Sequence, residues 1–227
     1  MKLQDKVVVI TGAGRGLGKS LATKLAKENT KLVISAETEE QIKTLAKEIN
    51  CLAIQADVST ENDVQNLADQ VVKQFGAIDI WINNAGIWIP HGPVESLDTK
   101  RLVKMFKVNV FGLIYGSKSA LTQMRKQSSG VILNIISTSA LSGRPNSSAY
   151  CASKFAASGF TKSLQEETKS SDIQAIAAYP GGMKTNLFDE AKPKDYDAYM
   201  SPDYVADILI DNLKSDKPQE EIIIKRP

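Results

Sequence analysis

The sequence is poor in the residues that bind metals and form disulfides. It contains one histidine, His91, and two cysteines, Cys51 and Cys151, among 227 residues. The cysteines show no CxxC or Cys/His spacing, and a lone histidine cannot complete a zinc site. We therefore expect neither a metal centre nor a disulfide, and we interpret both cysteines as small buried residues.

Long hydrophobic runs and blocks of like charge are also missing. No apolar run approaches 18 residues, and the first one, Val7 to Ile10, is too short for the core of a signal peptide. Lys and Arg number 28 against 26 Asp and Glu, which leaves a net charge of +2 and no basic block typical of nucleic-acid or membrane surfaces. We expect a soluble, cytoplasmic protein with neither kind of partner.

What the sequence does contain is a regular alternation of strand and helix patterns, with 42% hydrophobic residues to fill a core. Because crossovers between parallel strands need a helix, this alternation predicts an α/β fold: a single Rossmann-like domain over residues 1–227, with a doubly wound parallel sheet of about seven strands and helices on both faces. The longest helices are predicted from Thr99 to Lys126 and from near Tyr150. The predicted strands are Lys6 to Thr11, Lys31 to Ser35, Leu52 to Ala56, Asp79 to Asn83, Val131 to Ser137, Ile173 to Tyr179 and Ile222 to Lys225.

A glycine-rich stretch follows the first predicted strand, at the sheet edge where such folds bind ligands. Gly12, Gly16 and Gly18 fit the pattern Thr-Gly-x-x-x-Gly-x-Gly, which lets the backbone approach a pyrophosphate held by the N–H groups of the next helix. A Walker A loop does not fit, because Ala13 stands where its first glycine belongs, and GxGxxG fails because Leu17 holds its third place. A glycine turn without a ligand is the remaining alternative.

Tyr150 and Lys154 are the candidate proton-handling pair. If a helix begins near Tyr150, residues four apart share a face, so the ammonium group could stabilise a phenolate and make Tyr150 a usable acid or base near neutral pH. A free phenol titrates near about 10. The pair alone also fits an ordinary surface helix, and Ser137, 13 residues before Tyr150, could simply cap a turn at a strand end.

Taken together, the motifs resemble the nicotinamide-dependent short-chain dehydrogenase/reductase family, in particular its ketoacyl reductase-like members. The resemblance covers nearly the whole chain in the family's order. It is carried by the glycine loop, Asp57-Val58, Asn83 to Gly86, Asn109, Ser137 with Tyr150 and Lys154, and Pro180 to Thr185. It implies an oxidoreductase that transfers hydride between NAD(P)(H) and a small-molecule carbonyl or secondary alcohol.

Catalytic roles follow from the resemblance. It implies that Tyr150 is the general acid/base, that Lys154 also holds the nicotinamide ribose, and that Ser137 donates to the substrate oxygen, with Ser139 its nearest competitor. Asn109 resembles the residue that holds a water in a proton relay, although an asparagine in an apolar helix can equally mark a kink.

Cofactor contacts follow in the same way. Asp57 resembles the family's adenine-contacting acid, and it also suits the turn before a helix, where Thr60 and Asp63 form a capping-box pattern. Asn83 to Gly86 are expected to support the sheet edge. The predicted cofactor-binding residues are Gly12, Arg15, Gly16, Leu17, Gly18, Ala36, Glu37, Asp57, Val58, Asn84, Ala85, Gly86, Tyr150, Lys154, Pro180, Gly181 and Thr185.

The choice between NAD and NADP depends on the end of the second predicted strand. Ala36 occupies the usual place of the acid that bonds the ribose 2′-hydroxyl, and Arg15 offers charge to a 2′-phosphate. Glu37 could pair with Arg15 or repel that phosphate. This combination favours NADP(H) over NAD(H).

Three questions stay open at this level. The predicted substrate lining is apolar, with only His91 or Arg144 as charged groups within reach. Small residues beside Phe155 on the helix after Tyr150 suggest a homodimer or homotetramer, the family's habit, although packing on the chain's own sheet explains them equally well. A catalytically silent dinucleotide sensor and, less well, a P-loop nucleotide hydrolase are the alternative functions. The predicted lining is Ile87, Trp88, Ser139, Leu141, Gly182, Met183, Leu187 and Phe188.

Overall fold

Seven short strands, rich in β-branched residues, form the centre of the molecule. In the computed structural model, which describes residues 1–226, they build one parallel sheet in the order β3-β2-β1-β4-β5-β6-β7. The inner strands are buried on both faces, as a parallel sheet covered by helices requires. The strands are β1 (Val7–Thr11), β2 (Lys31–Ala36), β3 (Leu52–Gln55), β4 (Ile80–Asn83), β5 (Ser129–Ile135), β6 (Asp172–Pro180) and β7 (Glu221–Ile224).

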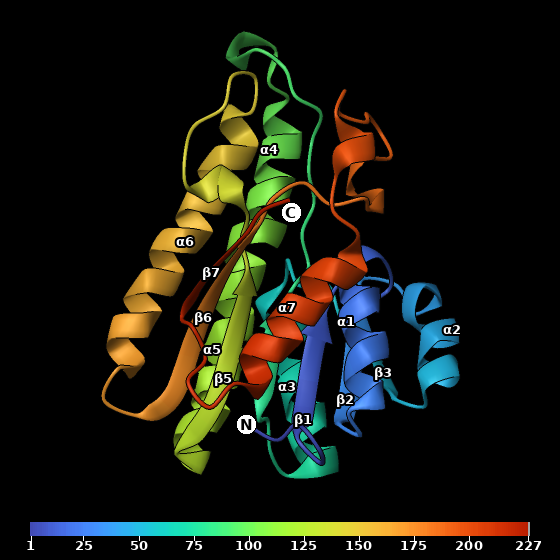
Figure 1. Cartoon of the computed structure of the whole chain (residues 1–227), viewed down its shortest axis with the longest axis vertical. Coiled ribbons are helices and arrows are strands. Elements are labelled where there is room, and N and C mark those ends of the chain that lie inside the picture. The colour runs from blue at the N-terminus through green and yellow to red at the C-terminus, as the bar shows by residue number, and fades with distance from the viewer. Residues whose placement is uncertain (227) are drawn as a thin grey trace.

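Helices cover the sheet on both faces, so the doubly wound α/β prediction is confirmed (Figure 1). One core packs α1, α2 and α7 against the sheet, and the other packs α3, α5 and α6. The helices are α1 (Gly16–Lys27), α2 (Glu40–Ile49), α3 (Glu61–Phe75), α4 (Thr99–Phe106), α5 (Gly112–Gln127), α6 (Ser148–Thr168) and α7 (Pro202–Lys214).

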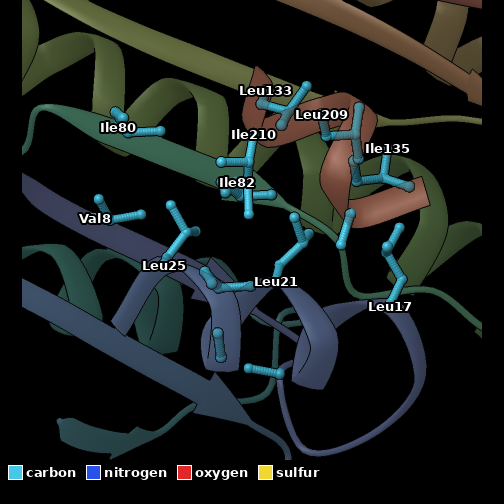
Figure 2. Close-up of a cluster of buried hydrophobic side chains, with 14 of the residues drawn as sticks. Val8, Leu17, Leu21, Leu25, Ile80, Ile82, Leu133, Ile135, Leu209 and Ile210 are labelled. Atoms are coloured by element: carbon cyan, nitrogen blue, oxygen red, sulfur yellow. The ribbon is translucent and has the colours of Figure 1, made fainter. Parts of the chain in front are cut away.

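The first core shows how the helical periodicity becomes packing. Leu17, Leu21 and Leu25 repeat every four residues along α1, lie at most 5% exposed, and face Leu209 and Ile210 of α7 across the sheet surface (Figure 2). Full burial of such a side chain stabilises a fold by roughly 1.5–3 kcal/mol. This packing fixes α1, and therefore the glycine loop at its start, on the sheet.

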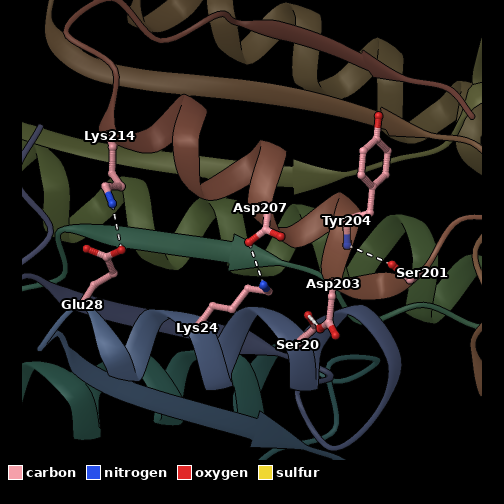
Figure 3. A network of polar contacts seen from close by, with 8 residues as sticks. All are labelled: Ser20, Lys24, Glu28, Ser201, Asp203, Tyr204, Asp207 and Lys214. Atoms are coloured by element: carbon pink, nitrogen blue, oxygen red, sulfur yellow. Dashed lines mark hydrogen bonds and ion pairs between the residues drawn. The ribbon is translucent and has the colours of Figure 1, made fainter. Parts of the chain in front are cut away.

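A row of polar contacts ties the same two helices together at the surface. Lys24 pairs with Asp207 at 2.6 Å, Lys214 pairs with Glu28 at 2.8 Å, and the Ser20 hydroxyl bonds Asp203 (Figure 3). Exposed pairs of this kind are each worth no more than about 1 kcal/mol. They set the register of α7 on α1 more than they add to stability.

The long helix predicted from Thr99 to Lys126 is interrupted. A π-helical turn, Lys107–Phe111, separates α4 from α5 and contains Asn109. Such turns are rare and concentrate at functional sites, because the extra residue re-aims a side chain out of the regular i→i+4 ladder.

None of the helices among residues 1–226 is both long and apolar enough to span a bilayer. Cys151 is buried, whereas Cys51 is only partly buried, so the expectation of two buried cysteines is wrong for Cys51.

Candidate active site

The strand order reverses between β1 and β4, which pair directly although β2 and β3 lie between them in the sequence. Parallel α/β sheets bind ligands in the crevice beyond the carboxyl ends of the strands at such a reversal. A cavity of about 500 Å³ opens there. It joins the glycine loop after β1 to the Tyr150 region of α6.

The glycine loop is held so tightly that side chains would not fit. Gly12 has φ +64°, and a Cβ on it would lie 2.7 Å from the Cα of Ala85. A Cβ on Gly18 would collide with the Gly12 carbonyl. These glycines therefore allow the glycine loop, the start of α1 and the segment after β4 to approach one another closely. On its cavity side the loop exposes backbone without side chains.

Helix α1 begins in that loop with its amide groups available. Its N-cap residue, Arg15, makes no side-chain capping hydrogen bond, and no acidic residue occupies the first turn. A helix N-terminus carries free N–H donors and partial positive charge, which suits a phosphate group. Together with the glycine cradle, this arrangement fits the pyrophosphate of a dinucleotide.

Asn84 supports the loop from β4. Its side-chain amide donates to the carbonyls of Thr11 and Gly12, both at 2.9 Å, and the Thr11 hydroxyl accepts from the backbone of Asn84 and Ala85 at 3.2 Å. Asn84 thus locks the end of β4 to the end of β1. The segment from Asn83 to Gly86 acts as the sheet-edge support that the sequence predicted.

Asp57 shapes the turn after β3. Its carboxylate accepts from the Ser59 N–H and hydroxyl, both at 2.9 Å, and Asp63 accepts from the Asp57 N–H at 3.1 Å. The prediction of a Thr60–Asp63 capping box is therefore wrong. Thr60 is the N-cap of α3, but its side chain makes no capping hydrogen bond, and the Asp63 carboxylate bonds the N–H of Asp57 instead of that of Thr60. Asp57 itself lines the cavity.

Tyr150, Lys154 and Ser137 meet at the other end of the cavity. Tyr150 and Lys154 lie on one face of α6, with the Lys154 ammonium 5.7 Å from the centre of the Tyr150 ring, and Ser137 lines the cavity with them. The Lys154 ammonium donates to the Ile135 carbonyl at 3.3 Å, and the Ser137 hydroxyl accepts from the Ser139 N–H at 3.0 Å. Ser137, rather than Ser139, is the serine whose hydroxyl lowers the pKa of Tyr150.

The protonation states differ from the prediction of a phenol brought toward neutrality by Lys154. Burial raises the pKa of Tyr150 to about 12, against the opposing hydrogen bond from Ser137, and burial lowers the pKa of Lys154 to about 8. Desolvation disfavours both charged forms, and the ammonium group of Lys154 lies over the Tyr150 ring and bonds the Ile135 carbonyl. The site therefore holds a neutral phenol, which is a proton donor.

Asn109 lies behind the cavity rather than on its wall. Its side chain accepts from the Ile87 N–H at 2.8 Å and donates to the Ile87 carbonyl at 2.9 Å and the Ser153 hydroxyl at 3.3 Å. Ser153 in turn donates to the Tyr150 carbonyl at 2.8 Å. Asn109 thus ties the π-helical turn to the loop after β4 and to the first turn of α6, while its oxygen stays beside Gly86.

Every other predicted site residue lines this one cavity. Residues that sequence reasoning missed also line it. One of them is Gly14, where a Cβ would collide with Gln41, and the number of glycines in the loop could have marked it. The others had no motif to mark them: Arg101 and Lys104 of α4, and Tyr199 beyond β6. The predicted residues on the cavity wall are Gly12, Arg15, Gly16, Leu17, Gly18, Ala36, Glu37, Asp57, Val58, Asn84, Ala85, Gly86, Ser137, Tyr150, Lys154, Pro180, Gly181 and Thr185.

The substrate end of the cavity is formed by the loop after β4, α4, the loop between β5 and α6, and the segment after β6. Leu141, predicted to line it, is 45% exposed and lies outside it, because its loop turns toward the surface. The other predicted lining residues are in place, and so are His91 and Arg144. No group of three metal-ligating side chains occurs within residues 1–226.

Comparisons with known proteins agree with this arrangement. The family model for short chain dehydrogenase matches residues 6–195. The chain is 31% identical to an uncharacterized oxidoreductase of Staphylococcus saprophyticus, over 97% of this chain and 94% of that protein. It is similar to the alcohol dehydrogenase from the archaeon Thermococcus sibiricus complexed with 5-hydroxy-NADP, with a TM-score of 0.91 and 27% identity, covering 98% and 97% of the two chains.

A second solved structure is the 3-ketoacyl-(acyl-carrier-protein) reductase from Brucella melitensis complexed with NADH. Its TM-score is 0.90 at 30% identity, covering 98% of this chain and 97% of that one. The chain belongs to the short chain dehydrogenase family. It is an NAD(P)-dependent oxidoreductase, and its substrate is a small molecule.

Proposed function

We propose that this protein reduces a carbonyl compound with NADP(H), using Tyr150 as the general acid, and that the reverse oxidation uses the same residue as base. The observation that carries the proposal is the meeting of Ser137, Tyr150 and Lys154 at one end of a cavity whose other end is the glycine loop. The reaction needs both ends: a dinucleotide site and a proton donor within reach of it.

The residues of the chain divide this work. Gly12, Gly16 and Gly18 with the start of α1 would hold the pyrophosphate, and Lys154 and Thr185 would hold the nicotinamide nucleoside. The bound cofactor supplies hydride to the carbonyl carbon. The chain supplies the proton to the carbonyl oxygen.

The neutral phenol of Tyr150 suits the donor role. A pKa of about 12 keeps it protonated at physiological pH, and Ser137 can donate a second hydrogen bond to the same substrate oxygen as charge develops there. Once the proton has left, the ammonium group of Lys154, which lies 5.7 Å from the centre of the Tyr150 ring, would stabilise the phenolate. Asn109 keeps α6 and the loop after β4 aligned while this happens.

NADP(H) is proposed over NAD(H) because of the adenosine end of the cavity. Arg15, Ala36 and Glu37 all line it, and within residues 1–226 Arg15 and Glu37 form no ion pair with each other or with any other side chain. Arg15 is thus available to a 2′-phosphate, while Ala36 offers nothing to a 2′-hydroxyl. The solved relatives bind both kinds of cofactor: one is complexed with an NADP derivative and another with NADH.

The test follows nicotinamide absorbance with NADPH and NADH against a panel of ketones, aldehydes and secondary alcohols. Turnover with NADPH at a higher kcat/KM than with NADH supports the proposal. Dinucleotide binding without turnover on any member of the panel would favour the catalytically silent sensor instead. An NAD preference above roughly tenfold, about 1.4 kcal/mol, would mean that Glu37 holds the 2′-hydroxyl.

We also propose that the whole chain acts as one unit that pairs into homodimers or homotetramers. Ala152, Phe155, Ala156 and Gly159 share one face of α6, and Phe155 is 47% exposed; Ala157 and Leu164, by contrast, are buried on the chain's own sheet. An exposed aromatic among small residues suits a partner helix. Light scattering at micromolar concentration tests this: a monomeric mass refutes it, and Phe155→Asp should lower the mass of the native assembly.

A further inference from the structure

The substrate end of the cavity is electrostatically one-sided. Its wall carries the basic side chains of Arg101 and Lys104 from α4 and Arg144 from the loop between β5 and α6. The cavity wall has only two carboxylates, Glu37 and Asp57, and both lie at the adenosine end, beyond β2 and β3. A cleft lined by one sign of charge concentrates ligands of the opposite sign.

The three basic groups are not equally available. Both terminal nitrogens of the Arg101 guanidinium group donate to the carboxylate of Glu190, at 2.7 and 2.5 Å, so the positive charge of Arg101 is already neutralised. Neither Arg144 nor Lys104 has an ion-pair partner within residues 1–226. Besides the buried Lys154 ammonium, two positive charges therefore remain uncompensated on this part of the cavity wall.

Arg144 is the one that stands beside the reacting centre. Its guanidinium donates to the Thr138 hydroxyl at 3.1 Å, one residue from Ser137, which leaves its other donors free. Arg144 lines the same cavity as Tyr150 and Tyr199, and its positive charge lowers the pKa of both phenols against the larger opposing effect of burial. A guanidinium presents a planar fork that matches an oxyanion in two parallel hydrogen bonds.

Aromatic side chains also line this end of the cavity. Phe188 packs edge-on against Trp88, with ring centres 5.2 Å apart, and against Tyr199 at 5.6 Å. These rings offer an apolar surface to the body of a substrate, and Arg144, which is exposed, offers its guanidinium on the same cavity wall. The substrate end thus combines an apolar surface with one free guanidinium next to the proton donor.

We infer that the preferred substrates are carbonyl compounds that carry an apolar body and an oxyanion, a carboxylate or a phosphate, and that Arg144 binds this oxyanion. The inference rests on the proposed function and deepens it, since it names the class of carbonyl compound. Lys104, exposed on the rim, adds attraction at longer range. The alternative is a structural role, in which Arg144 only holds its loop in place through the hydrogen bond to Thr138.

The experiment compares charged and neutral members of matched pairs. The probes are phenyl ketones with a carboxylate one, two or three carbon atoms from the carbonyl, each beside its methyl ester and its phosphonate counterpart. For the wild type we expect kcat/KM to be at least about tenfold higher for the best anion than for its ester, about 1.4 kcal/mol, mostly through KM. The carboxylate and phosphonate arms tell which oxyanion fits.

Variants separate recognition from bracing. Arg144→Ala should abolish the preference for the anion, Arg144→Lys should restore part of it, and Arg144→Glu should reverse it. Arg125→Ala, which removes an exposed charge on α5 far from the cavity, is the matched control and should keep the wild-type ratio. If Arg144 only braces its loop, Arg144→Ala should lower kcat/KM for the anion and for the ester by the same factor, so that their ratio does not change. It should also lower the melting temperature.

A binding measurement keeps this inference distinct from the proposed function. Calorimetry with Tyr150→Phe saturated with NADP⁺ reports affinity for each pair without turnover. If the ester is turned over and the anion is neither preferred nor bound more tightly, the inference fails while the reductase stands. If the anion binds more tightly through Arg144 but no member of any pair is turned over, the site is anion-selective and the proposed reaction fails.

Discussion

The two ends of the cavity are built in different ways. The adenosine end consists of short contiguous segments, the glycine loop above all, in which bare backbone and hydrogen bonds such as those from Asn84 do the work. The substrate end consists of side chains from four separated segments, joined by aromatic packing and one free guanidinium. At the adenosine end, close backbone packing restricts almost every residue to one type. At the substrate end, single residues can be substituted without loss of the fold.

The largest effect is expected where the two ends meet. Tyr150→Phe should lose at least about a hundredfold in kcat, because general-acid help is worth 10²–10⁴, while dinucleotide binding persists. Stopped-flow absorbance gives turnover, and cofactor fluorescence gives binding. Tyr115→Phe on α5, outside the cavity, is the control. Near-normal turnover in the Tyr150 variant would remove this residue from the mechanism.

The burial of Lys154 predicts a conflict between stability and function. Burial lowers its pKa from 10.5 to about 8, so below about pH 8 the folded protein confines a charge that the unfolded chain exposes to water. Between about pH 8 and 10.5 the unfolded chain binds more protons, so this group makes the free energy of unfolding rise with pH.

Lys154→Met should therefore raise the free energy of unfolding at pH 7, by up to about 3 kcal/mol, while it abolishes turnover. The gain should shrink as the pH rises from about 8 to 10.5 and vanish above that window, where the wild-type lysine is neutral in both states. Urea unfolding at pH 7 and pH 9.5 measures it, with Lys126→Met on the exposed end of α5 as control. A loss of stability at pH 7 would show that the buried ammonium is a net stabilising group.

A smaller effect should follow from filling the glycine cradle. Gly12→Ala adds a Cβ 2.7 Å from the Ala85 Cα at a φ of +64°, so the loop must shift and dinucleotide affinity should fall by at least about tenfold. Gly92→Ala is the matched control, since its new Cβ would meet nothing within 4 Å. Titration of cofactor fluorescence decides, and equal affinities for the two variants would contradict the tight-cradle interpretation.

The smallest effect concerns cofactor choice. Arg15→Ala should lower kcat/KM for NADPH about tenfold and leave the value for NADH within about twofold, since an arginine–phosphate contact is strong and charge-assisted. Steady-state kinetics with one ketone measures both values. Equal losses of kcat/KM with the two cofactors would mean that Arg15 binds the pyrophosphate, which both cofactors share, and not the 2′-phosphate.

The sequence by itself determined the fold class, the succession of strands and helices along the chain, and nearly all of the residues that line the cavity around the glycine loop. Those features depend on local rules: β-branched runs for buried strands, leucines four apart on α1, and glycines where φ is positive. It also placed Ser137, Tyr150 and Lys154 in one site, because strand ends and helix starts gather at the same edge of a parallel sheet.

Only the tertiary structure decided the rest. Asn109, in the π-helical turn, bonds Ile87, 22 residues away in the sequence. The pKa shifts of Tyr150 and Lys154 follow from burial, which depends on the neighbouring segments. Whether Arg101 or Arg144 is free depends on where Glu190 lies. Local patterns cannot encode such facts, because they are properties of distances between segments that are remote in the sequence.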